Sequence, residues 1–194
     1  RKMKYLVIFD LEATCWEEGH PKYSRTDSEI IEIGAVKVNK QTGDAIDSFQ
    51  RFVRPHFHPI LSDYCTNLTT IRQEDIFNAE LIDMILPEFN DWIDDAEYIM
   101  SWGHYDKNQI ISECKLKNID LGTLKYKLEN RHLNMKNQFS HVFNLKRCGV
   151  SKALKFLNLK FQGMQHRGID DAINIAKIYK TSKDKFFETI YEHD

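Results

Sequence analysis

The chain has 194 residues, a formal net charge of −2, 42% apolar residues and 29% charged residues. This length is sufficient to bury a substantial core in one domain. The absence of any run of about 18 uncharged apolar residues excludes a membrane-spanning helix, and the near-neutral charge excludes a strong global field that attracts nucleic acid.

The N-terminal part of the sequence predicts an antiparallel meander. Residues 4–9 (KYLVIF) are rich in β-branched and aromatic residues and predict a central strand. In residues 29–39, apolar and polar side chains alternate enough to predict a second strand. A hairpin turn at 41–44 then leads to a third strand at 45–55, which Pro55 stops.

Short helices and one more strand are predicted for the middle of the chain. Residues 62–79 carry several Ser, Thr, Asn and Asp capping candidates and suggest short helices after a loop at 56–62. Residues 81–95 have apolar residues at helical spacing, with Pro87 marking a kink or an early turn of the helix. Residues 96–102 predict a short apolar strand.

The rest of the chain is predicted to be mainly helical. The helix at 105–118 is expected to turn three residues inward: Ile110, Ile111 and Cys114. Residues 144–159 and 166–193 continue the helical pattern, with Ser151 as an N-cap. Early strands followed by interleaved helices are typical of an α/β domain with a mixed sheet. We expect a single domain over residues 1–194, with its core at about 4–180.

The cysteines and the N-terminus indicate the compartment. The four cysteines are scattered without a CxxC pair, which argues against a zinc site or a disulfide framework. Reduced thiols are typical of cytosolic proteins. The basic N-terminal start precedes an apolar segment that is short and interrupted by Asp10, so we do not expect a signal peptide. These features predict a cytoplasmic protein that does not bind a membrane.

Two carboxylates follow the first predicted strand. Asp10 and Glu12 are two residues apart, so on an extended chain they point to the same face. Like charges this close repel, and burying either is costly unless a cation or a proton compensates. The pair therefore predicts a metal site, with an ordinary loop-end carboxylate pair as the alternative.

Three further residues are candidates for the same site. Asp106 follows the strand at 96–102, and taken alone it is a candidate helix N-cap. Asp171 falls in the first turn of a predicted helix, where the macrodipole favours a carboxylate whatever its role. His166 lies in the loop before that helix, where a lone histidine is more often an ordinary surface residue.

The combined pattern, Asp-x-Glu, a distant Asp and His-x4-Asp, resembles the histidine-bearing (DEDDh) branch of the DEDD exonuclease superfamily. The resemblance extends over about residues 5–180 to a subgroup that contains the histone-mRNA 3′ exonuclease and bacterial sporulation-inhibitor proteins. Five segments carry it: FDLEATCW, EIIEIGAVKV, RFVRPHFHPILSDYCTNLTTI, ISEC and HRGIDDAINIAKI. One departure is Tyr105, where close relatives often have Trp.

The resemblance implies a ribonuclease-H-like α/β fold, with a mixed five-stranded sheet flanked by helices. It implies a metal-dependent 3′–5′ exonuclease that hydrolyses single-stranded nucleic acid, with RNA favoured, from the 3′ end and releases nucleoside 5′-monophosphates. It also implies two divalent cations, Mg²⁺ or Mn²⁺, with His166 as general base and four metal ligands: Asp10, Glu12, Asp106 and Asp171.

The resemblance further implies a binding site for the 3′-terminal nucleotide. The backbone of Ala13 and Thr14 is expected against the terminal 3′-hydroxyl, and Leu68, Thr69 and Ile71 are expected to flank the last base. Ordinary helix packing is the alternative for Leu68 and Ile71.

Two other functions stay open. A DNA-preferring 3′–5′ exonuclease is possible because the core does not settle how a 2′-hydroxyl is received. A regulatory binding protein that inhibits a sporulation kinase pathway is suggested by the description of the bacterial relatives, although five intact candidate positions weigh against a purely non-catalytic role. No protein partner is identified. Residues 181–193 predict either a terminal helix that packs through Phe186, Phe187 and Ile190, or an exposed partner site.

Overall fold

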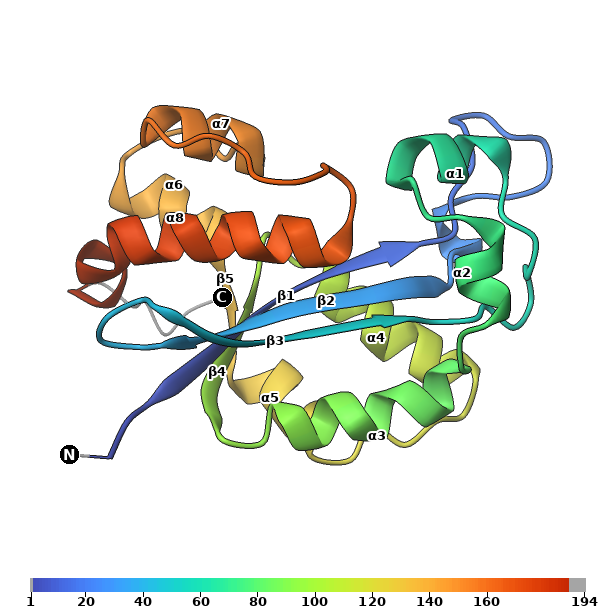
Figure 1. Cartoon of the computed structure of the whole chain (residues 1–194), viewed down its shortest axis with the longest axis horizontal. Helices are drawn as coiled ribbons and strands as arrows, with labels where there is room; N and C mark the ends of the chain where they lie inside the picture. The colour runs from blue at the N-terminus through green and yellow to red at the C-terminus, as the bar shows by residue number, and fades with distance from the viewer. Residues whose placement is uncertain (1, 189–194) are drawn as a thin grey trace.

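A mixed five-stranded sheet runs through the centre of the computed structural model, which describes residues 2–188 and their side chains to residue 186 (Figure 1). The strands lie in the order β3 (Ala45–Phe52), β2 (Ile30–Asn39), β1 (Tyr5–Ala13), β4 (Ala96–Ser101) and β5 (His132–Asn134). β1 pairs antiparallel with β2, which pairs antiparallel with β3, whereas β4 is parallel to both β1 and β5. The predicted mixed five-stranded α/β sheet with a central first strand is confirmed.

Helices cover both faces of this sheet (Figure 1). One face packs against α3 (Ile82–Trp92), α4 (Tyr105–Leu116) and α5 (Thr123–Asn130). The other packs against α6 (Met135–Val142), α7 (Val150–Phe156) and α8 (Gly168–Glu188). The short elements η1 (Arg25–Asp27), α1 (Asp63–Thr69) and α2 (Gln73–Phe77) complete the set in the described residues, and α1 and α2 lie near the carboxyl end of β1.

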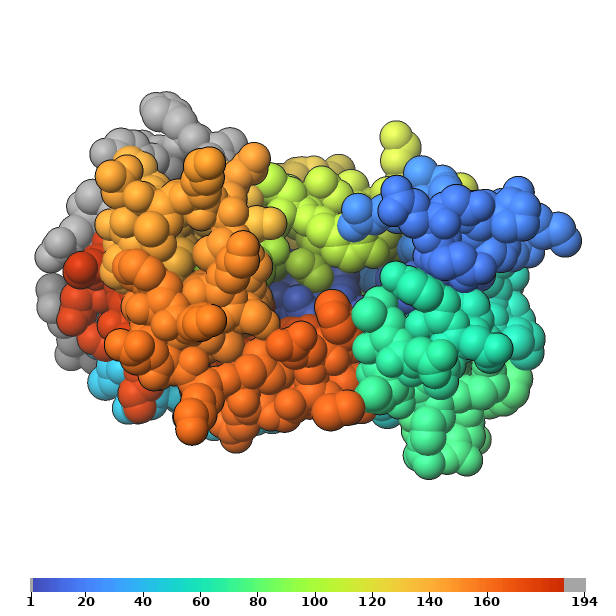
Figure 2. All heavy atoms as spheres, turned by 90° about the horizontal axis from the view of Figure 1, so that it is seen from above, coloured from blue at the N-terminus to red at the C-terminus, as the bar shows by residue number. Residues whose placement is uncertain are grey.

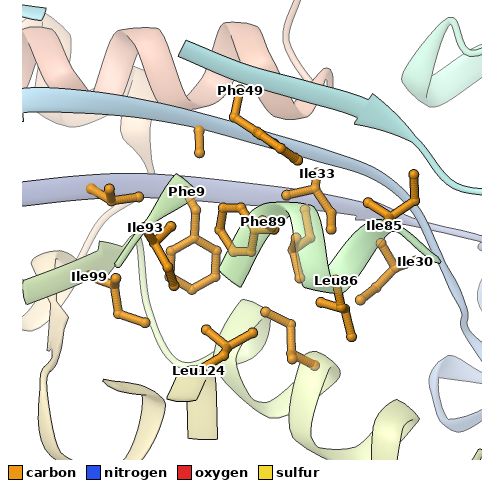
Figure 3. Packing of buried hydrophobic residues seen from close by; sticks show 14 of the residues in the cluster. Phe9, Ile30, Ile33, Phe49, Ile85, Leu86, Phe89, Ile93, Ile99 and Leu124 are labelled. Atoms are coloured by element: carbon orange, nitrogen blue, oxygen red, sulfur yellow. The ribbon is translucent and has the colours of Figure 1, made fainter. Parts of the chain in front are cut away.

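The larger core lies between the sheet and α3–α5. Phe9 of β1 and Phe89 of α3 meet near its centre with ring centroids 6.3 Å apart, and Phe49 of β3 lies 5.2 Å from Phe89 (Figure 3). Each such fully buried side chain contributes about 1.5–3 kcal/mol relative to an exposed one. This packing fixes β1 rigidly between its neighbours.

Alternation along β1 assigns its residues to the two cores. Phe9 joins the core under α3–α5, whereas Leu6 and Ile8 join the core under α6–α8. Because side chains alternate with a period of two, Asp10 and Glu12 continue the row of Leu6 and Ile8. The two acids therefore point to the face that α8 covers.

Two local predictions concern helices. Pro87 lies in the interior of α3, past its first turn, so the early-turn alternative is wrong and the kink stays a prediction. α7 begins at Val150 with Gly149 as its N-cap, so Ser151 is not the cap. The Ser151 hydroxyl oxygen instead accepts a hydrogen bond from Gln165 Nε2 at 2.9 Å.

The predicted terminal helix is the last part of α8, which runs without interruption to Glu188. Phe186 is buried and its ring meets that of Tyr179 at 6.3 Å, as the packing alternative requires. The side chain of Phe187 and residue Ile190 lie outside the described residues. No helix within residues 2–188 combines the length and apolar character needed to cross a bilayer.

Candidate active site

Three carboxylates converge where β1 meets the start of α8. Asp10 and Glu12 come from β1, and Asp171 comes from the first turn of α8. One carboxylate oxygen of each lies within 4.8 Å of the corresponding oxygen of the other two. This donor set is made of oxygen atoms alone, which fits a hard divalent cation such as Mg²⁺ or Mn²⁺.

Two glycines allow α8 to approach the sheet this closely. Gly34 of β2 is paired with Asp10, and a Cβ atom at Gly34 would lie 2.1 Å from the backbone nitrogen of Ile169. A Cβ atom at Gly168 would lie 2.9 Å from the carbonyl oxygen of Asp10. A side chain at either position would push the helix outward, so this glycine pair sets the depth at which Asp171 reaches the strand.

Asp106 reaches the same edge of the sheet from the opposite helical layer. It is the second residue of α4, whose N-cap is His104, so the N-cap alternative for Asp106 is wrong. Its carboxylate Oδ1 accepts a hydrogen bond from the backbone N–H of Leu11 at 2.9 Å, and the residue is only 4% exposed. Burial, and after it the charge of Asp106, raises the pKa of Asp10, so the two carboxylates interact electrostatically.

Burial perturbs all four carboxylates, and repulsion from neighbouring charges adds to its effect on Asp10, Glu12 and Asp171. Burial, with added repulsion from Asp171, raises the pKa of Glu12 to about 10. Burial and the charges of Asp106 and Glu12 raise the pKa of Asp10 well above its usual range. Burial also raises the pKa of Asp106 and that of Asp171 to about 7 each. Carboxylates in this state hold protons in the absence of a cation, so a bound cation replaces those protons.

His166 lies in the loop before α8 and is exposed. Its backbone has a φ of 62°, in the left-handed region that few non-glycine residues adopt. Its backbone N–H donates to Asp171 Oδ2 at 3.1 Å, which favours the ionised form of that carboxylate and opposes part of the rise in its pKa that burial causes. The backbone of His166 is therefore bonded to the metal-ligand candidate while its imidazole remains accessible to a substrate.

Glu32 is a further carboxylate beside these four that the sequence analysis did not single out. It lies opposite Glu12 in the β1–β2 ladder, is fully buried, and contributes to raising the pKa of Glu12. Arg167 donates to its two oxygens at 3.2 and 3.1 Å, and Gln50 donates at 2.9 Å. Glu32 thus anchors the residue next to His166. Its sequence signal is an acid inside the otherwise apolar run EIIEIGAVKV.

The two residues after the acidic pair lead out of β1. The carbonyl oxygen of Ala13 accepts a weak hydrogen bond from Cys65 Sγ at 3.7 Å. The backbone N–H of Thr14 donates to the carbonyl oxygen of Glu29 at 2.8 Å, and Thr14 Oγ1 accepts from the Glu29 N–H at 2.9 Å. These bonds fix the chain directly beside the carboxylates, and the contact of Ala13 and Thr14 with a 3′-hydroxyl stays a prediction.

Of the three residues predicted to flank the last base, Leu68 alone is exposed, at 36%. Ile71 is fully buried in a small cluster with Ile31 and Ile76, so the packing alternative describes it. Thr69 is also buried, and its hydroxyl donates to the carbonyl oxygen of Cys65 at 2.8 Å. Of these three residues, Leu68 is therefore the one whose side chain is exposed to a base.

The site opens to solvent through a hollow. Figure 2 shows dark blue atoms of β1 at the bottom of this hollow, between the orange segment before α8, the teal segment of α1 and the yellow-green start of α4. A cavity of about 550 Å³ also follows the end of β1, lined by residues 15–20, 23–25 and 28 together with Tyr64. Asp10, Glu12 and Asp171 are each partly exposed, so a substrate can reach them from outside.

Comparison with known proteins identifies the family. The exonuclease family model matches residues 7–179. ERI1 exoribonuclease 2 of Xenopus laevis is 32% identical over 198 residues, which cover 90% of this chain and 28% of that protein. The 3′-5′ exoribonuclease 1 of Homo sapiens is 30% identical over 185 residues, which cover 90% of this chain and 51% of that protein. The chain thus spans about a quarter to a half of the length of these two relatives.

Solved structures show the same architecture. The nuclease domain of 3′hExo, a DEDDh family member bound to rAMP, matches with a TM-score of 0.83 at 27% identity, over 93% of this chain and 92% of that one. Exonuclease I matches with a TM-score of 0.71 at 10% identity, which supports the ribonuclease-H-like fold alone. Since the family model extends from β1 into α8 and includes all five candidate positions, the chain belongs to the exonuclease family.

Proposed function

We propose that this chain is a single-domain, divalent-metal-dependent 3′–5′ exonuclease that removes nucleotides from single-stranded RNA. The observation that carries the proposal is the convergence of Asp10, Glu12 and Asp171 within 4.8 Å, next to β1, whose atoms lie at the bottom of the hollow in Figure 2. The names of the relatives, which are 3′-5′ exoribonucleases, and the rAMP bound to the similar nuclease domain support the choice of reaction and substrate.

The carboxylates are assigned to two cations, Mg²⁺ or Mn²⁺. We assign Asp10, Glu12 and Asp171 to the first, and Asp10 with Asp106 to the second. When bound, such a pair of cations neutralises the phosphate, lowers the pKa of a coordinated water and braces the leaving oxygen. Because burial raises the pKa of Glu12 to about 10, binding must displace a proton, and we expect metal affinity to increase with pH.

His166 is assigned as the general base. Its backbone is bonded to Asp171 and its ring faces solvent, so the imidazole is free to accept the proton of the attacking water when a substrate is present. Attack of the water oxygen on phosphorus breaks the P–O3′ bond. The products are a nucleoside 5′-monophosphate and a strand shorter by one nucleotide, with a new 3′-hydroxyl.

The 3′-terminal nucleotide is assigned to the end of β1 and to α1. Ala13 and Thr14 are placed against the 3′-hydroxyl, and the exposed side chain of Leu68 is placed against the last base, with Thr69 and Ile71 supporting it from the interior. An apolar side chain contacts every base face without reading its edge, so we expect little sequence preference.

The proposal is tested by a time course with 5′-labelled single-stranded RNA and matched DNA, each with Mg²⁺, with Mn²⁺ and with a chelator. We expect a metal-dependent ladder that shortens from the 3′ end and is faster on RNA, with nucleoside 5′-monophosphate as product. Faster shortening of DNA would overturn the substrate assignment and favour the DNA exonuclease. No cleavage of either strand under any metal condition would overturn the enzymatic assignment and favour a binding protein.

A further inference from the structure

Charge is distributed very unevenly along this chain. Residues 131–169 contain eight Lys and Arg residues and no Asp or Glu. The remaining residues contain 19 Lys and Arg against 29 Asp and Glu. The near-neutral total therefore conceals one segment with a charge of +8 and a remainder with a charge of −10. The positive segment forms β5, α6, α7 and the loop that carries His166.

Four of these cations are exposed and close together in sequence. Lys146 and Arg147 lie in the loop before α7, and Lys152 and Lys155 lie on α7 itself. Among the side chains that the structure describes, only Arg167 of the eight cations forms an ion pair, with Glu32. The charges of Lys146, Arg147, Lys152 and Lys155 are therefore available to a ligand.

Two hydrogen bonds attach this basic stretch to the segments that carry the site. Trp102 Nε1, four residues before Asp106, donates to the carbonyl oxygen of Cys148 at 2.8 Å. Gln165 Nε2, next to His166, donates to Ser151 Oγ at 2.9 Å. The stretch thus lies directly beside the site, and Figure 2 shows this orange part of the chain as one wall of the hollow.

The outer face of α7 combines charge with an aromatic ring. Lys152, Lys155 and Phe156 are exposed, whereas Ala153 and Leu154 are buried against the body. Positions three and four apart on a helix share one face, so the exposed side chains form one stripe. Cations interleaved with an exposed aromatic ring are typical of surfaces that follow a single-stranded nucleic acid.

We propose that Lys146, Arg147, Lys152, Lys155 and Phe156, hereafter the α7 surface, bind the substrate strand on the 5′ side of the nucleotide being removed. The cations contact its phosphates, and Phe156 stacks on a base. This inference rests on the proposed exonuclease function. The charge of −10 outside the segment repels a polyanion, so the α7 surface supplies the attraction that holds a strand while its 3′ end is cleaved.

The test compares two double variants with the same loss of charge. The test variant is R147Q/K152Q. The control is K115Q/K125Q, which removes exposed lysines from α4 and α5 on the opposite face of the sheet. The first readout is the ratio of kcat/KM for a long single-stranded RNA to kcat/KM for a dinucleotide, whose single internucleotide phosphate is the one being cleaved. The second is the salt dependence of strand binding, measured by fluorescence anisotropy.

We expect the test variant to lower the kcat/KM ratio and to reduce the slope of log affinity against log salt by about 1.4, since each lost phosphate contact on a single strand contributes about 0.7. The control should change neither quantity. An unchanged ratio and slope in the test variant, or equal changes in the control, would overturn the proposal that the α7 surface binds the substrate strand.

The binding readout separates this inference from the proposed function. If the wild-type protein cleaves neither the long strand nor the dinucleotide, the exonuclease proposal fails. The α7 surface as a strand-binding site is then judged by anisotropy alone. A reduced salt slope in R147Q/K152Q supports it, and unchanged binding overturns it.

Discussion

Gly34→Ala tests whether the close packing of α8 against β2 sets the geometry of the carboxylates. The added Cβ atom would lie 2.1 Å from the backbone nitrogen of Ile169 and 2.2 Å from the carbonyl carbon of Gly168. Ordinary van der Waals contact begins at 3.4 Å, so the start of α8 must move outward by about 1.3 Å, the difference between 3.4 and 2.1 Å. Asp171 moves with it, away from Asp10 and Glu12.

The expected cost of this movement has two parts. Overpacking of this kind typically lowers the free energy of unfolding by about 1–3 kcal/mol, which leaves a protein of ordinary stability folded. A misplacement of about 1 Å in a catalytic geometry can cost about 100-fold in rate. We therefore expect Gly34→Ala to fold, to bind Mn²⁺ more weakly and to lose about 100-fold in turnover.

The measurement combines urea denaturation, Mn²⁺ titration and turnover of 5′-labelled RNA. Gly149→Ala is the matched control, because Gly149 has a φ of −75° and a Cβ atom there would meet no other atom within 4 Å. The control should keep turnover and metal affinity close to those of the wild type. Wild-type turnover by Gly34→Ala would refute the inference that the close packing of α8 against β2 positions Asp171.

Three further predictions concern buried charge. Arg167→Met leaves Glu32 buried without its cation, so unfolding experiments in urea should show a loss of about 3 kcal/mol, and no loss would contradict the ion pair. Lys117→Met leaves the buried Glu29 without the ammonium group 2.8 Å away. We expect the free energy of unfolding in urea to fall by about 3–5 kcal/mol. A smaller fall would mean that water replaces the cation. Burial lowers the pKa of His132 to about 3, so below pH 6.5 the unfolded chain binds a proton that the folded chain does not. The free energy of unfolding should therefore fall by up to about 1.4 kcal/mol per pH unit as the pH decreases from 6.5 toward 3. His132→Gln should flatten this dependence. An equally steep curve for the variant would assign the pH dependence to other groups.

The parts of the site that depend on local periodicity could be predicted from the sequence. The i, i+2 spacing of Asp10 and Glu12 on a strand places both on one face, and the structure puts that face under α8. The apolar spacing after Asp171 likewise predicts the helix that presents this carboxylate. The position of Asp106 at the start of α4 follows from the strand before it and from the turn at Gly103.

The parts that depend on contacts between distant segments could not be predicted. β5 has only three residues, and its pairing with Ile99–Ser101 rather than its own sequence makes it a strand. Ile71 lies in a polar stretch, and only the small cluster around it decides that it is buried. Glu32 and Gly34 read as ordinary strand residues until α8, more than 130 residues later, is packed against them.

The metal-centre assignment is tested most directly by a Mn²⁺ titration and a single-turnover assay on the same samples of wild type, Asp10→Asn and His166→Ala. We expect Asp10→Asn to lose both metal binding and turnover, because this carboxylate is assigned to both cations. We expect His166→Ala to bind Mn²⁺ as the wild type does and yet to lose most of its turnover. Full turnover by His166→Ala, or normal metal binding with normal turnover by Asp10→Asn, would contradict the assignment of this carboxylate cluster as a metal-dependent exonuclease centre.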